Sequence, residues 1–141
     1  METGIALSVE SRTLAGILLL ALVTVETRGL YMLKIVRGKA EVTPFQTSFA
    51  RAGHAHAGVL LILALLCQVL ADSTDQTGFL DWLSRSGVAA SALLMPGGFF
   101  FSSMGRGREK PNALITLVLL GALLLAVSLT SLGVGLLRSA A

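Results

Sequence analysis

The chain has 141 residues, of which 54% are hydrophobic and only 13% charged, and its mean hydropathy is +0.80. A water-soluble domain carries about a quarter charged residues, so this composition excludes an ordinary soluble protein and indicates a polytopic membrane protein. The net charge of +3 indicates no nucleic-acid partner, because in a membrane protein the position of the basic residues carries the information. The single cysteine, Cys67, excludes an intramolecular disulfide.

Residues 14–36 form the first predicted transmembrane helix. This segment carries charged side chains, Glu26 and Arg28, within its apolar span. The second helix is predicted over residues 44–71. Its start is marked by the segment 43–46, which combines a capping hydroxyl, a proline in the first turn and a glutamine three residues after the cap.

The third helix is predicted over residues 84–104. It contains Pro96 followed by two glycines, and we expect a kink or local unwinding there, because proline removes a helical hydrogen bond and glycine weakens the helix. The fourth helix is predicted over residues 111–137, which carry no charge and begin with a proline. The acidic connection 72–81 is expected to be a solvated outer loop.

Short connections between four apolar segments predict an all-α fold, an antiparallel four-transmembrane-helix bundle that forms one domain over residues 1–141. Basic residues are unevenly distributed between its two ends. Seven flank the first and third connections, against three at the other end. This distribution favours a cytoplasmic location for the first and third connections, with both termini outside. The expected location is a bacterial cytoplasmic membrane. The seven are Lys34, Arg37, Lys39, Arg51, Arg106, Arg108 and Lys110, and the three are Arg12, Arg85 and Arg138.

The antiparallel arrangement places the polar and aromatic residues of interest in one half of the bundle: Glu26, His54, His56 and the aromatic end of the third helix. A charged side chain at the membrane centre costs roughly 2.5 to 3.5 kcal/mol on insertion scales, so such residues usually face the bundle interior and find partners. We expect Glu26 to pair with a histidine. The alternative is that Glu26 reaches toward the lipid headgroups.

The segment 51–58 holds both histidines of the chain, His54 and His56, among small residues. Residues two apart on a helix point about 200° from each other, so we expect one imidazole to face the core and the other a neighbour or lipid. A neutral imidazole is a common ligand of metals and of haem iron. The alternative is a histidine that is hydrogen-bonded to another helix for structural reasons.

The run Phe49-Ala50-Arg51-Ala52, followed by His56-Ala57-Gly58, resembles the second helix of styrene oxide isomerase, a small four-helix membrane enzyme. The chain length, the four spans and the Pro111-Asn112 pair before the fourth helix are similar as well. The resemblance implies that His56 is the proximal ligand of haem b, whose iron acts as a Lewis acid on an epoxide oxygen so that a hydride shift gives an aldehyde. It also implies a homotrimer with haem pockets between subunits.

The same resemblance suggests roles for further residues. Arg51 suits a haem propionate, with an interfacial anchor on the cytoplasmic side as the alternative. Gly58 belongs to the haem-binding triplet, and Glu26 orients an imidazole or anchors a propionate partner. An alignment on Arg51 favours His54 as the iron ligand instead. An apolar pocket for a small-molecule substrate is then lined by Glu26, Ile62, Phe99, Phe100 and Phe101, with Ile62 at the position of an asparagine in the isomerase.

Two alternative functions share this fold. In one, the protein is a non-catalytic small membrane protein, structural or regulatory, held together by a buried network of histidine and glutamate. In the other, which we favour least, a haem with two histidine ligands from different subunits transfers electrons. The chain also resembles small bacterial integral membrane proteins with a Gly-His-Ala-His-Ala-Gly stretch, a resemblance that implies no activity.

Overall fold

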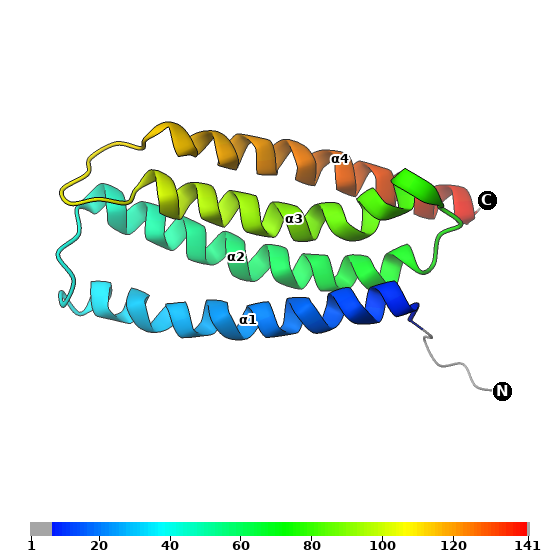
Figure 1. The fold of residues 1–141 in the computed structure, drawn as a ribbon, viewed down its shortest axis with the longest axis horizontal. Coiled ribbons are helices and arrows are strands. Elements are labelled where there is room, and N and C mark those ends of the chain that lie inside the picture. Colours follow the sequence, from blue (N-terminus) through cyan, green and yellow to red (C-terminus); the bar gives the residue numbers. More distant parts are fainter. Residues whose placement is uncertain (1–6, 141) are drawn as a thin grey trace.

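The computed structural model describes residues 7–140 and confirms an all-helical, antiparallel four-helix fold, with no strand in that range. The helices follow one another up and down along a common axis (Figure 1). They are α1 (Val9–Val36), α2 (Pro44–Ala71), α3 (Gly78–Ser102) and α4 (Thr116–Ser139), with a short 3-10 turn, η1 (Ala113–Ile115), before α4.

The four helices form an open row rather than a closed ring. Each helix packs mainly on its neighbour in the chain, α3 most extensively on both α2 and α4, while α1 and α4 make no contact along their described lengths (Figure 1). The core lies mainly along α2 and α3, with Leu18 from α1 and Leu132 from α4, and it includes small or slim buried residues. These include Ala64, Cys67, Ala71, Val88 and Ala92.

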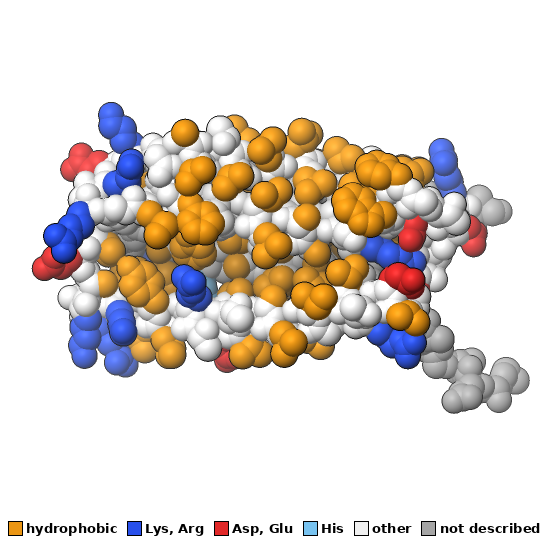
Figure 2. All heavy atoms as spheres, viewed as in Figure 1, with side chains coloured by type: hydrophobic (Ala, Val, Ile, Leu, Met, Phe, Trp, Pro, Cys, Tyr) orange, Lys and Arg blue, Asp and Glu red, His pale blue; other side chains and the backbone are white. Residues whose placement is uncertain are grey.

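Three apolar segments, α1, α2 and Ala113–Ser139, are each long enough to cross a membrane. α3 is less apolar, yet its 25 residues extend about 37 Å between the two helices that flank it. Hydrophobic side chains cover the middle of the visible face, and most charged side chains lie at its two ends (Figure 2). This distribution is that of a polytopic membrane protein.

Hydrogen-bonding caps fix where the helices begin. The predicted capping box of α2 is confirmed: Thr43 Oγ1 accepts from the Gln46 amide at 3.1 Å, and the Gln46 side chain accepts from the Thr43 amide at 3.1 Å. α1 begins at Val9, five residues before the predicted start, because Ser8 caps it. α3 also begins earlier than predicted, at Gly78.

The expected unwinding at Pro96 does not occur, because α3 remains helical through Pro96 to Ser102. Close packing against α4 accompanies this continuity. A Cβ atom on Gly98 would lie 2.7 Å from the Val118 backbone nitrogen, and one on Gly121 would lie 3.0 Å from the Met95 backbone nitrogen. Only glycine permits this approach at either position.

Candidate functional site

The two histidines lie on different sides of α2. The ring of His54 faces α1, where a Cβ atom on Gly29 would lie 3.7 Å from Cε1 of His54. The ring of His56 faces α3 and lies 5.1 Å from the ring of Phe99, centroid to centroid. Both imidazoles are half-buried. The two rings point to different sides of α2, as expected for residues two apart on a helix, and they do not share a site within one protomer.

His56 is oriented by its own helix. Its Nδ1 atom lies 2.8 Å from the carbonyl oxygen of Ala52, one turn earlier. A carbonyl oxygen can only accept a hydrogen bond, so Nδ1 is the donor, and in the neutral imidazole Nε2 has the free lone pair. Within residues 7–140, Nε2 has no hydrogen-bond partner. Histidines that bind a metal through one nitrogen usually donate from the other to a carboxylate, backbone carbonyl or water, and His56 has this arrangement.

Aromatic rings surround the imidazole of His56 on one side. Phe99 contacts His56 and also packs edge-on against Phe49, with ring centroids 5.5 Å apart. Phe100 instead lies over Gly53, where an added Cβ would be 3.1 Å from the phenyl ring. Phe101 is exposed, and Phe100 and Phe101 both line a different cleft, which does not include Phe99. The three phenylalanines therefore do not all line one pocket around His56.

The remaining candidate residues lie apart from His56. Arg51 is exposed, as is Ile62, whose relative exposure is 61%. Gly58 faces open space, since no atom lies within 4 Å of an added Cβ. Glu26 is exposed and forms no ion pair with any described residue, so the expected pairing of Glu26 with a histidine is not formed.

The position of Glu26 follows from how α1 is rotated about its axis. Arg28, Tyr31 and Ile35 share the face of α1 that borders a cleft with α2. Glu26 precedes Arg28 by two residues and so points to the opposite side of the helix. Within residues 7–140 no three or more histidine, cysteine, aspartate or glutamate side chains come together to hold a metal ion. An iron held by a porphyrin requires fewer protein ligands than such a cluster.

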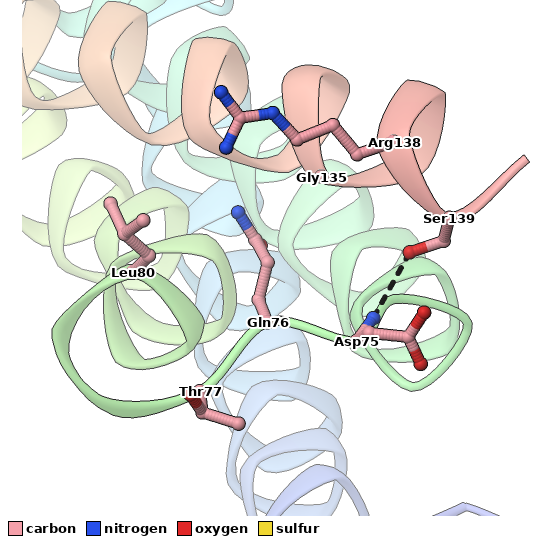
Figure 3. Close-up of a pocket in the computed structure, with 7 residues that line it drawn as sticks. All are labelled: Asp75, Gln76, Thr77, Leu80, Gly135, Arg138 and Ser139. Atoms are coloured by element: carbon pink, nitrogen blue, oxygen red, sulfur yellow. Dashed lines mark hydrogen bonds between the residues drawn. The ribbon is translucent and has the colours of Figure 1, made fainter. Parts of the chain in front are cut away.

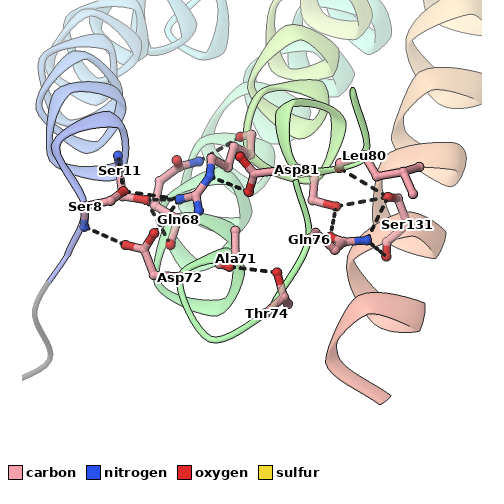
Figure 4. Close-up of polar contacts among 12 residues, drawn as sticks. Ser8, Ser11, Gln68, Ala71, Asp72, Thr74, Gln76, Leu80, Asp81 and Ser131 are labelled. Atoms are coloured by element: carbon pink, nitrogen blue, oxygen red, sulfur yellow. Dashed lines mark hydrogen bonds and ion pairs between the residues drawn. The ribbon is translucent and has the colours of Figure 1, made fainter. Parts of the chain in front are cut away.

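A polar cluster at the opposite end of the bundle, near the start of α1, was not predicted (Figure 4). Arg85 donates to Asp72 at 2.5 Å, to Asp81 at 2.7 Å and to the hydroxyl of Ser11 at 2.6 Å. Asp72 also accepts from the backbone amide of Ser8 at 2.9 Å. The expectation of a solvated acidic loop is therefore wrong for Asp72 and Asp81. The spacing of Asp81 and Arg85, four residues apart on a helix, is the one local signal for the pair.

The electrostatics of this cluster favour the charged form of Asp72. Burial raises the pKa of this carboxyl group, but the hydrogen bonds from Ser8, Arg85 and Ser11 outweigh burial and hold the pKa at about 2. The side chains of Arg85 and Asp72 are only 13% and 11% exposed. The cluster therefore joins α1 to the ends of α2 and α3 by a charged pair that is largely shielded from water.

A second polar contact joins α3 to α4. Gln76 points toward α4 beside Gly135, next to a pocket of about 390 Å³ (Figure 3). Its amide nitrogen donates to the carbonyl oxygen of Ser131 at 3.0 Å, and its carbonyl oxygen accepts from Ser84 at 2.8 Å. Both ends of the Gln76 amide are therefore paired within the protein, and its hydrogen bonds help to pack α3 against α4.

Comparisons of the chain with protein-family models, curated proteins and solved structures give no match. Function is therefore inferred from the chain's own side chains. Among them, His56 is distinctive because its Nδ1 is fixed while its Nε2 is left without a partner among the described residues.

Proposed function

We propose that this chain is a haem b-binding membrane protein in which Nε2 of His56 ligates the iron. The hydrogen bond between Nδ1 of His56 and the carbonyl oxygen of Ala52 carries the proposal. It fixes the tautomer and the orientation of the ring, and it makes Nε2 a better electron donor. An imidazole in an apolar helix with no protein partner for that nitrogen is suited to a ligand from outside the chain.

The surroundings of His56 fit a porphyrin in chemical character. Phe99 gives the imidazole an aromatic neighbour. Arg51, on the same helix and exposed, supplies a cation for a propionate group. His54 points to the other side of α2, so it would not join His56 in holding the same haem within one protomer. Haem held by His56 would supply a Lewis acid for the oxygen of an epoxide.

The activity that we propose for such a site is the isomerisation of an apolar epoxide to an aldehyde. This reaction is balanced without a co-reactant, because one carbon–oxygen bond breaks and a hydride moves to the adjacent carbon. The chain's own part is to hold the haem through His56 and to present apolar side chains, Phe99 among them, to the substrate. The resemblance to styrene oxide isomerase supports this reaction.

His56 lies at the flank of a single protomer, so a haem there needs a cover. We propose that a second copy of the chain provides it in a homotrimer, as the family resemblance implies. The open row supports this arrangement, because α1 and α4 of one protomer do not close a ring. We also propose a bacterial cytoplasmic membrane with both termini outside, on the distribution of basic residues.

A non-catalytic structural role is the second candidate, and the polar cluster around Arg85 favours it. That cluster and the Gln76 contact hold neighbouring helices together without any ligand. They are built from arginine, aspartate, glutamine and serine rather than from the histidine and glutamate that the sequence suggested.

Titration of the purified protein with haem separates these candidates. Haem ligation predicts a Soret band that saturates at a fixed haem-to-protein ratio, and the loaded protein is then offered an aryl epoxide with detection of the aldehyde. If the Soret band saturates but no aldehyde forms, the proposed haem binding stands and the proposed isomerase activity is contradicted. A protein that gives no Soret band with added haem contradicts both and leaves the structural role.

A further inference from the structure

A cleft of about 440 Å³ opens between the last turns of α1, the start of α2 and the end of α3. It contains neither histidine, so it does not depend on the proposed haem site. Its apolar lining includes Ile35, Ala50, Phe100, Phe101 and Met104. Figure 2 shows a hollow with hydrophobic side chains on the visible face, toward the end where most Lys and Arg gather.

Two arginines from distant parts of the chain meet at this cleft. Arg28 comes from α1 and Arg106 from the connection after α3, and both are exposed. Glu41 is the one carboxylate in the lining, so the charged residues of the cleft sum to a positive charge. Neither arginine pairs with a carboxylate within residues 7–140. Arg28 lies about 12 Å of helix rise before the end of α1, and its long side chain can extend toward that end, where the headgroups lie.

Hydrogen bonds hold the wall that carries Arg106 in place. The amide nitrogen of Gln46 donates to the carbonyl oxygens of Ser103 at 2.9 Å and Gly105 at 2.7 Å. The hydroxyl of Thr43 donates to the carbonyl oxygen of Arg108 at 2.5 Å. The capping box of α2 thus also fixes the connection after α3, on both sides of Arg106. Arg106 therefore lies in a segment that hydrogen bonds hold in place on both sides.

The position of the cleft matches the boundary between lipid and water. It is formed where α1 ends, α2 begins and α3 ends, at the end of the bundle that carries most of the basic residues. Headgroup phosphates lie at this level, and each lysine or arginine near an anionic membrane surface contributes about 1 kcal/mol of attraction. The phenylalanines and Met104 in the lining suit an acyl chain.

We infer that this cleft binds an anionic phospholipid, with the phosphate between Arg28 and Arg106 and an acyl chain along Phe100 and Phe101. The proposal combines an excess of positive charge, an apolar floor and a location at the interface. Arginine binds a phosphate group more strongly than lysine does, because its guanidinium group can donate two parallel hydrogen bonds to the phosphate oxygens.

The test compares lipid binding by native mass spectrometry of the purified protein with phosphatidylglycerol, phosphatidylcholine and inorganic phosphate. We expect the wild type to bind phosphatidylglycerol more tightly than phosphatidylcholine. Arg28→Gln and Arg106→Gln are each expected to weaken phosphatidylglycerol binding about fivefold and to leave phosphatidylcholine binding unchanged. Arg28→Lys, which keeps the charge, is expected to retain most of the preference and shows that the bundle still folds.

Arg37→Gln is the matched control, because Arg37 is an exposed cation at the same end of the bundle outside the cleft lining. It is expected to leave the preference intact. Equal losses in Arg37→Gln and the two cleft variants would show attraction to the whole basic surface and would overturn the site. An unchanged preference in Arg28→Gln and Arg106→Gln would overturn it too. If inorganic phosphate binds as tightly as phosphatidylglycerol, the ligand is a free anion, and the proposal of a phospholipid site is overturned.

Discussion

Replacement of Asp72 by asparagine tests whether the polar cluster holds α1 against the rest of the bundle. The substitution keeps the size of the side chain and removes its charge, so Arg85 loses one of its two carboxylate partners. The pKa of Asp72 falls from an ordinary value of 3.8 to about 2, because the hydrogen bonds from Ser8, Arg85 and Ser11 outweigh the opposing effect of burial. At 1.36 kcal/mol per unit, this difference corresponds to about 2 kcal/mol of the free energy of unfolding at pH 7.

The pH dependence has a definite sign. A carboxyl group whose folded pKa lies below its unfolded value stabilises the folded state fully above the unfolded pKa of 3.8. This contribution is lost as the pH falls through the folded pKa of about 2. The stability difference between the wild type and Asp72→Asn should therefore be constant near neutral pH, decrease below about pH 4 and vanish only below about pH 2.

The assay is equilibrium unfolding in detergent micelles, followed by helical circular dichroism. Asp75→Asn is the matched control, since Asp75 belongs to the same connection and is exposed without an ion pair among the described residues. It should change the free energy of unfolding by less than about 0.5 kcal/mol. Equal stabilities of Asp72→Asn and Asp75→Asn at pH 7 would refute the account of the cluster.

Two further predictions concern packing and topology. Gly135→Ala should destabilise the protein by about 1–3 kcal/mol in the same unfolding assay, because its Cβ would lie 2.6 Å from the fixed side chain of Gln76. Gly133→Ala is the control and should leave stability unchanged, because no atom lies within 4 Å of its added Cβ. Equal effects of the two substitutions would contradict the packing argument. Lys39 and Lys110 should react with a membrane-impermeant amine reagent from the same side of the membrane, and labelling from opposite sides would contradict the antiparallel bundle.

The sequence predicts those parts of the fold that depend on local chemistry. The start of α2 follows from Thr43 and Gln46, whose reciprocal bonds involve only neighbouring residues. The early start of α1 also has a local signal, since Ser8 accepts a hydrogen bond from the Ser11 amide. The sequence could not show the bond from the backbone amide of Ser8 to Asp72, which is 64 residues away. Continuous helix through Pro96 likewise accompanies the packing of α4 on α3.

The failure to place Glu26 has a physical cause. α1 is apolar on most of its surface, so its sequence gives little indication of which face meets α2. Packing decides this rotation, and it turns Arg28 toward the cleft and Glu26 away from it. The sequence grouped Phe99, Phe100 and Phe101 in one pocket, but packing places Phe99 against His56 and Phe100 and Phe101 at the cleft beside α1.

The comparison of His56→Ala with His54→Ala tests the proposed iron ligand most directly. Both variants remove one imidazole from the same helix, two residues apart, so general effects on folding are matched. The account predicts that His56→Ala weakens haem binding by more than about 100-fold. This loss exceeds the one expected when a residue that only supports a metal ligand is replaced. His54→Ala is expected to keep the wild-type Soret band. A Soret band retained in His56→Ala, or lost in His54→Ala alone, would contradict ligation by His56.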